Sequence, residues 1–213
     1  MADPTVDDDH AAVAPVAAVA PVDPVPAMAP SGGLRQQLQE LDENVYRAVA
    51  ISRTPTLDRL MRGVSTAANY SVLWGGIAGV LAVRPGRGRQ AAVQGLVAIG
   101  LTSFVANQGL KRVVTRNRPA RDDAAVPIAR HVRMPGSTSF PSGHSASAFA
   151  FASAVGDQLP LLSPALHATA TAVAYSRVHT GVHYPGDVLA GSLLGLVVGN
   201  AVPAVTSWFA RHR

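Results

Sequence analysis

Four long stretches without a charged residue are the strongest constraint in this sequence. They cover residues 63–83, 90–110, 158–176 and 188–210 of a chain of 213 residues. Each is about 20 residues long, the length that a helix needs to cross the hydrocarbon core of a membrane. They are rich in Ala, Gly, Val and Leu, and small residues let helices pack closely in lipid. A soluble bundle of buried helices is the alternative, but it would leave so short a chain little polar surface.

The first 62 residues differ in character from the rest of the chain. Residues 1–33 have prolines every few positions, which prevents a helix, and we expect a disordered Ala/Pro-rich tail. Residues 34–62 combine helical spacing of apolar residues with many charges, which predicts amphipathic helices at the membrane interface. Residues 63–210 follow as one membrane domain. Because no strand alternation is found, we expect an all-α fold: a multi-span bundle with about five membrane-embedded helices plus the N-terminal amphipathic helix.

Composition narrows the possible functions. The chain has no cysteine, which excludes disulfides, thiolate metal sites and a cysteine nucleophile. Its formal charge is +5, and a basic protein suits nucleic acid, a membrane surface or phosphorylated substrates. Aromatic residues make up only 5% of the chain and are not interleaved with basic ones, so we expect no nucleic-acid partner.

The placement of arginine predicts the orientation in the membrane. With five alternating helices, the arginines of residues 84–89 and 211–213 fall on one side, which the positive-inside rule assigns to the cytoplasm. The arginines of residues 53–62 argue for the opposite orientation. On the first assignment, residues 111–141 and 177–187 share the outer side.

Three polar clusters lie on that outer side. The first is KRVVTRNRP, residues 111–119. Lys111, the only lysine, and Arg118 are seven residues apart, which would place both on one face of a helix. The alternative is a charged flank that anchors a span in the membrane.

The second cluster is PSGH, residues 141–144, at the start of a small and apolar stretch. Ser142 is a suitable N-cap for a helix whose free backbone N–H groups, that of Gly143 included, could bind an anion. His144 falls in the first turn of this helix. A capped helix with an incidental histidine is the alternative.

The third cluster is SRVHTGVHYPGD, residues 176–187. Arg177 ends one helix, and Asp187 lies in the first turn of the next. His183 is four residues before Asp187, so the carboxylate could hold the imidazole in one tautomer. The alternative is a His/Asp pair that stabilises a loop.

Taken together, the three clusters resemble the type 2 phosphatidic acid phosphatase (PAP2) superfamily, which also includes the vanadium haloperoxidases. The family pattern is Lys, six residues, Arg-Pro; then Pro-Ser-Gly-His; then Ser-Arg, five residues, His, three residues, Asp. All three parts are present in order, and the resemblance covers about residues 60–207. Full-length membrane relatives usually have six spans, so the N-terminal part departs from the pattern.

The resemblance implies metal-independent hydrolysis of a phosphomonoester or pyrophosphate through a phosphohistidine, with no cofactor. In this mechanism His183 is the nucleophile, Asp187 orients it, and His144 protonates the leaving group and then activates water. The phosphate would be bound by the residues that supply positive charge or hydrogen-bond donors, namely Lys111, Arg118, Arg177, Ser142 and Gly143. His179 matches no catalytic position of the family, and we expect it to be structural.

The predicted function is therefore that of a membrane lipid phosphatase. The substrate could be a glycerolipid phosphate or a polyprenyl-linked one. The lysine-poor composition suggests a GC-rich bacterial genome, and the short chain resembles small actinobacterial members of the family with roles in cell-wall biogenesis, whose substrates include a decaprenylphosphoryl-phosphoribose phosphate. The expected location is a bacterial cell membrane with the active site on the periplasmic side. A vanadate-dependent haloperoxidase and a non-catalytic lipid-binding membrane protein are the alternatives.

Overall fold

The computed structural model describes residues 33–212, and its regular elements are all helical within that range. The predicted tail lies outside the described residues except for Gly33. The α-helices are α1 (Leu34–Ala50), α2 (Pro55–Ala67), α3 (Val72–Ala82), α4 (Arg87–Phe104), α5 (Lys111–Val113), α6 (Gly143–Gln158), α7 (Ser163–His179) and α8 (Pro185–Arg211). A π-helical segment, Val105–Leu110, joins α4 to α5, and short 3-10 turns lie at Asn69–Ser71, Ile128–Arg130 and Pro160–Leu162. The prediction of an all-α fold is confirmed for this part of the chain.

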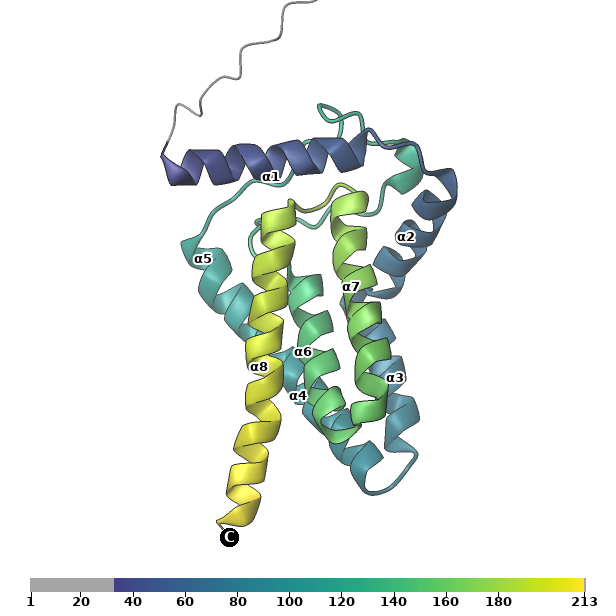
Figure 1. Ribbon diagram of the computed structural model, residues 1–213, viewed down its shortest axis with the longest axis vertical. Coiled ribbons are helices and arrows are strands. Elements are labelled where there is room, and N and C mark those ends of the chain that lie inside the picture. The colour runs from purple at the N-terminus through teal and green to yellow at the C-terminus, as the bar shows by residue number, and fades with distance from the viewer. Residues whose placement is uncertain (1–32, 213) are drawn as a thin grey trace, which may run out of the picture.

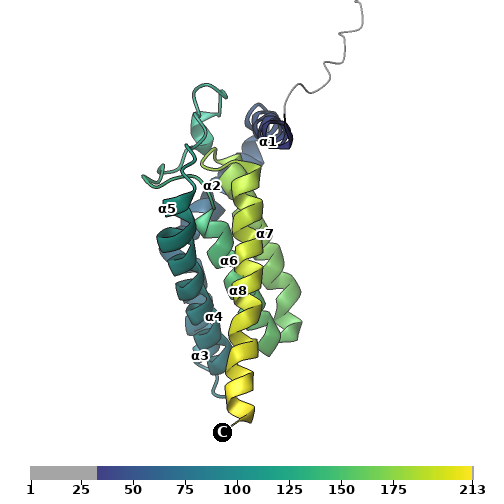
Figure 2. The same ribbon diagram turned by 90° about the vertical axis from the view of Figure 1, so that its left-hand side faces the viewer.

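Helix α6 forms the axis of the bundle. It packs against α4, α7 and α8, and these surround it in both views (Figures 1 and 2). From residue 145 to residue 156, every residue of α6 except Phe149 is buried. This explains why the sequence of α6 has small residues on all sides and no apolar stripe, because a helix enclosed by other helices has no polar face.

Glycines on α8 allow the close contact with α6. Cβ atoms added at Gly191, Gly195 and Gly199 would collide with α6, where each would meet the backbone oxygen of residue 142, 146 or 150, respectively. Both series advance by four residues, so the two helices run parallel and start at the same end. Small residues at every fourth position are the usual means of such close packing between membrane helices.

Helix α1 lies across one end of the bundle, above the ends of α7 and α8 in Figure 1. Helix α1 is amphipathic, as its sequence predicts, and its leucines at positions 34, 38 and 41 are exposed. The loop between α3 and α4 and the C-terminal end of α8 share the opposite end, as the arginine pattern requires (Figure 1). The division between interfacial helices and membrane domain at residue 62 falls inside α2 and stays a prediction.

One expected span is interrupted. The uncharged stretch 63–83 was expected to form a continuous span, but Tyr70 and Ser71 adopt left-handed backbone conformations with φ of 52° and 59°. L-residues with a side chain rarely take this conformation, and it ends α2 and starts α3 in a new direction. Within the described range, two helical segments are long and apolar enough to cross a membrane, namely Arg87–Val113 and Pro185–Phe209. The number of spans therefore stays a prediction.

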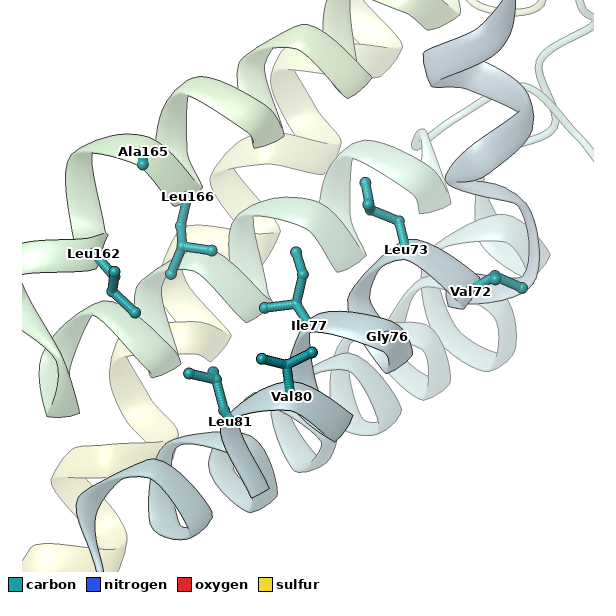
Figure 3. Close-up of a pocket in the computed structure, with 9 residues that line it drawn as sticks. All are labelled: Val72, Leu73, Gly76, Ile77, Val80, Leu81, Leu162, Ala165 and Leu166. Carbon is teal, nitrogen blue, oxygen red and sulfur yellow. The ribbon is translucent and has the colours of Figure 1, made fainter. Parts of the chain in front are cut away.

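An apolar cavity of about 560 Å³ lies between α3 and the start of α7. Its lining is shown in Figure 3 and consists of aliphatic side chains and glycine, among them Val72, Ile77 and Leu166. The cavity begins directly after the turn at Tyr70 and Ser71. It contains no group that could perform acid–base or nucleophilic chemistry.

Candidate active site

A polar cavity of about 260 Å³ lies at the end of the bundle where α6 and α8 begin. Residues from all three sequence clusters line it: Lys111, Arg118, Gly143, His144 and His183. The two histidines, 39 positions apart in the sequence, thus open onto one cavity. The turn between α2 and α3 closes one side of it, through Ala68, Tyr70 and Ser71.

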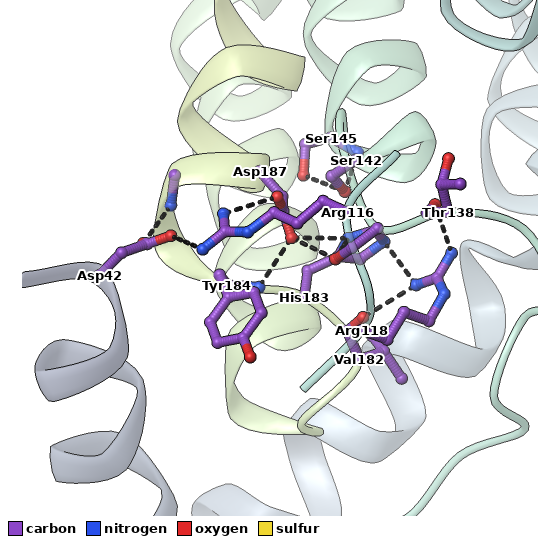
Figure 4. A network of polar contacts seen from close by, with 12 residues as sticks. Asp42, Arg116, Arg118, Thr138, Ser142, Ser145, Val182, His183, Tyr184 and Asp187 are labelled. Atoms are coloured by element: carbon purple, nitrogen blue, oxygen red, sulfur yellow. Dashed lines mark hydrogen bonds and ion pairs between the residues drawn. The ribbon is translucent and has the colours of Figure 1, made fainter. Parts of the chain in front are cut away.

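His183 lies in the tight loop between α7 and α8 and is 1% exposed. The loop reverses at Gly181, which has a φ of 69°, and the His183 N–H donates to the carbonyl oxygen of Arg177 at 3.2 Å. The ring nitrogens have different neighbours. Nδ1 lies 3.5 Å from Asp187 Oδ2, and Nε2 lies 3.2 Å from Arg118 Nη1 (Figure 4). The spacing of four residues therefore places the carboxylate beside the imidazole, as predicted.

The pKa of His183 is lowered to about 4, chiefly because burial disfavours the charged ring. The carboxylate of Asp187 raises this pKa, and the positive charges of Arg118 and Arg177 lower it. Desolvation and the two guanidinium groups outweigh the carboxylate. The imidazole is consequently neutral at physiological pH and retains a free electron pair on one nitrogen.

Asp187 is fully buried and is held by several donors. Its Oδ2 accepts hydrogen bonds from the Ser139 hydroxyl and, at 3.0 Å, from the Tyr184 N–H, while its Oδ1 lies 3.0 Å from Arg116 Nη1 (Figure 4). The bond to Tyr184 follows from the local sequence, because Asp187 is the third residue of α8 and closes a capping box. A buried carboxylate needs such donors to stay ionised.

The start of α6 has the predicted cap. Ser142 Oγ accepts hydrogen bonds from the Ser145 N–H at 3.4 Å and from the Ser145 hydroxyl at 2.9 Å. Ser142 does not line the cavity, whereas Gly143 and His144 do. His144 Nε2 lies 3.1 Å from Asn69 Oδ1 in the turn between α2 and α3. The interruption of the expected span therefore supplies a polar partner for this histidine.

The two cations of the first cluster do not share a helix. Their spacing of seven residues allows one helical face, but α5 ends at Val113 and Arg118 lies in an irregular segment. Arg118 precedes Pro119, and a following proline disfavours helical backbone at the residue before it. Lys111 Nζ and Arg118 Nη2 still converge, because both contact Ser137 Oγ, at 3.1 and 3.3 Å.

Arg177 lies deeper than the other two cations. It is 1% exposed, and its Nη1 donates to Ser65 Oγ at 2.5 Å. It is not among the residues that line the cavity. Its Nε has no hydrogen-bond partner among the described residues. A binding role of Arg177 toward phosphate therefore stays a prediction.

A separate buried network lies between α1, α2 and α7. Arg130 is 0% exposed and its Nε lies 2.8 Å from Asp58 Oδ1, while His179 Nε2 lies 2.9 Å from the same oxygen. Arg130 also donates to the carbonyl oxygen of Val49 at 2.8 Å. His179 is thus held by Asp58 and does not line the polar cavity, and its structural role stays a prediction.

Sequence reasoning missed four residues next to the site: Asp42, Asn69, Arg116 and Ser139. Arg116 lies inside the first cluster, where its charge was the available signal. Asp42 and Asn69 approach from distant parts of the chain, and Ser139 lies two residues before the second cluster, but nothing in their local sequence marks them. Among residues 33–212, no group of three or more His, Asp or Glu side chains is arranged to hold a metal ion.

The fold and the cavity together define a helical bundle with a polar cavity at one end, which two histidines and two cations line. The chain belongs to the PAP2 superfamily, whose family model matches residues 91–211. It is 35% identical over 167 residues to decaprenylphosphoryl-5-phosphoribose phosphatase of Mycobacterium tuberculosis, covering 77% of this chain and 89% of the relative.

Two solved structures have the same architecture. The PAP2-type phosphatidylglycerolphosphate phosphatase of Bacillus subtilis matches with a TM-score of 0.65 and 26% identity, over 83% of this chain and 90% of that one. LpxE of Aquifex aeolicus matches with a TM-score of 0.61 and 25% identity, over 77% and 95% of the two chains. The family and these relatives support a membrane lipid phosphatase of the PAP2 type.

Proposed function

We propose that this protein hydrolyses the phosphate of a membrane lipid through a phosphohistidine formed on His183. The observation that carries the proposal is the shared cavity: two imidazoles and two cations line it, and a buried carboxylate stands behind one of the imidazoles. A nucleophile, an acid–base group and charge stabilisers at one pocket are the components that phosphoryl transfer requires.

In the first step, Nε2 of His183 attacks phosphorus. Nδ1 is turned toward Asp187, so Nε2 carries the electron pair that attacks once the phosphate takes over its contact with Arg118, and the low pKa of His183 keeps it unprotonated. The N–P bond forms while the bond to the leaving oxygen breaks, and His144 gives that oxygen a proton. Asp187 stabilises the positive charge that develops on the His183 ring.

In the second step, water replaces the enzyme on phosphorus. His144 takes a proton from a water molecule, the water oxygen attacks phosphorus, and the N–P bond breaks to release phosphate. Lys111 and Arg118, which line the cavity, bind the phosphoryl oxygens in both steps, assisted by the Gly143 N–H, while the buried Arg177 adds positive charge near His183. These cations supply the charge stabilisation that a metal ion gives in other phosphatases, so activity should persist in EDTA.

The substrate we propose is a polyprenyl-linked phosphate, with a decaprenylphosphoryl-phosphoribose phosphate as the first candidate. The relative from Mycobacterium tuberculosis, which aligns with 77% of this chain, bears that substrate in its name. The apolar cavity between α3 and α7 (Figure 3) adjoins the turn at Tyr70 and Ser71 that also borders the polar cavity. A lipid with its phosphate between the histidines could place an apolar tail there. The arginines of residues 84–89 and the C-terminal end of α8 lie at the opposite end of the bundle (Figure 1), which the positive-inside rule assigns to the cytoplasm, so the site would face the periplasm.

The test is phosphate release by the purified protein in detergent with EDTA present, against a panel of polyprenyl, glycerolipid and lipid A phosphates. We expect turnover of at least one polyprenyl phosphate, loss of turnover in His183→Ala, and an acid-labile phosphoprotein when the wild type is denatured in alkali during turnover. Binding of these lipids without hydrolysis would instead identify a lipid-binding protein. Bromide oxidation that depends on added vanadate would identify a haloperoxidase.

A further inference from the structure

Helix α1 reaches the carboxylate behind His183 through two consecutive ion pairs (Figure 4). Asp42 Oδ2 lies 2.6 Å from Arg116 Nη2, and Arg116 Nη1 lies 3.0 Å from Asp187 Oδ1. The side chains of Asp42, Arg116 and Asp187 are 11%, 26% and 0% exposed, so this row of alternating charges is largely shielded from water. Charges in such surroundings interact more strongly than they would on an open surface.

Further contacts fix the same part of α1 on the start of α8. Asp42 Oδ1 accepts a hydrogen bond from the Gly186 N–H at 2.6 Å, which satisfies one of the free donors at the N-terminus of α8. The guanidinium of Arg116 lies 4.1 Å from the centre of the Tyr184 ring, and this ring packs edge-on against Tyr46, one turn after Asp42. Asp42 lies outside residues 91–211, the part of the chain that the family model matches, so the family pattern does not include this contact.

We propose that Asp42 and Arg116 are positioning residues, which hold the Asp187 carboxylate in the orientation that supports His183. The proposal rests on the function proposed above. The terminal torsion of an aspartate is broad, so the partners of its two oxygens decide how it is turned. Arg116 donates to Oδ1 of Asp187, the oxygen that does not face His183, and the ion pair with Asp42 holds Arg116 in place.

The first test is Asp42→Asn in the full-length protein, assayed with the best lipid phosphate of the panel. We expect kcat to fall about tenfold, the lower end of the range known for outer partners of metal-binding histidines, and KM to change less than about twofold. Neither residue lines the polar cavity, so substrate binding should be spared. Glu43→Gln is the matched control, because it removes one charge from the neighbouring position, where Glu43 forms an ion pair with the exposed Arg47 and accepts a hydrogen bond from Gln39, both in α1.

A second variant separates positioning from folding. A Cβ atom at Gly186 would lie 3.0 Å from Asp42 Oδ2 and 3.3 Å from its Cγ, so Gly186→Ala displaces the carboxylate without removing it. Alanine favours helical backbone more than glycine does, so α8 should not be weakened. We expect a severalfold lower kcat with an unchanged or higher Tm.

The outcomes separate the two proposals. Wild-type kcat in both Asp42→Asn and Gly186→Ala, together with an inactive His183→Ala, would overturn the positioning role and leave the proposed function intact. Full activity of His183→Ala would overturn the proposed function itself. A fall in kcat that is equally large in Glu43→Gln would show a general effect of charge on α1 and would also overturn the positioning role.

Discussion

Replacing Gly199 by alanine tests the packing of α8 on α6. The added Cβ would lie 2.6 Å from the backbone oxygen of Ala150 and 2.8 Å from Ser153 Cβ. Neither atom is the end of a flexible side chain, so the helices must separate by roughly half an ångström, enough to weaken many dispersion contacts along their interface. Overpacking of this kind costs about 1–3 kcal/mol, and the rigid backbone contact places Gly199→Ala in the upper half of that range.

The control is Gly100→Ala in α4. A Cβ at Gly100 would have no neighbour within 4 Å, so this variant shows only the gain in helix propensity, up to about 1 kcal/mol. The two variants should therefore differ by about 2–3 kcal/mol, which corresponds to about 4–12 °C in Tm for a chain of this size. Thermal unfolding of both proteins in the same detergent measures this difference. An equal Tm for Gly199→Ala and Gly100→Ala would refute the close packing of α8 on α6.

Three further predictions concern buried polar groups. Folding lowers the pKa of His183 from about 6.5 to about 4, so between about pH 6.5 and pH 4 the unfolded chain binds this proton and the folded protein does not. As pH falls through this range, the free energy of unfolding of the wild type should decrease by on the order of 3 kcal/mol relative to that of His183→Ala. A Tm difference between the two proteins that is constant with pH would contradict this. Ser65→Ala removes the hydroxyl that accepts a hydrogen bond from Arg177, and a hydrogen bond of a charged group is worth about 1.5–3 kcal/mol. We expect kcat/KM to fall at least about tenfold in steady-state assays. An unchanged kcat/KM would exclude Arg177 from the site. Asp58→Asn leaves the buried Arg130 without a carboxylate partner and should destabilise the protein by about 3–5 kcal/mol, measured by thermal unfolding. The kcat of the folded protein should not change. A wild-type Tm would show that the network contributes no stability.

The parts of the site that depend on short sequence distances could be predicted from the residues. His183 and Asp187 are separated by one turn that contains Pro185, so few backbone paths exist and the carboxylate must lie near the ring. The Ser142 cap and the helix after it follow from local chemistry in the same way. That His144 and Lys111 share a cavity with His183 was an implication of the family resemblance, because neither spacing nor composition fixes a contact across the bundle.

The contacts that were missed have a common physical cause. Asp42 lies 145 positions before Asp187 and reaches it through Arg116, and its own surroundings look like any amphipathic helix. Ser139 is similarly unmarked within its loop. The turn at Tyr70 and Ser71 contains no glycine, the residue that usually indicates a left-handed backbone. The uncharged stretch around it therefore resembles an unbroken span in the sequence.

The enclosure of α6 has a consequence for how the protein tolerates different membranes. Peripheral helices meet lipid and adjust to bilayer thickness by tilting, at a modest cost per ångström of mismatch. The axis that carries His144 touches protein on all sides, and its 16 residues span only about 24 Å. Changes in lipid chain length would then be absorbed at the rim of the bundle, while the distance between the two imidazoles stays constant.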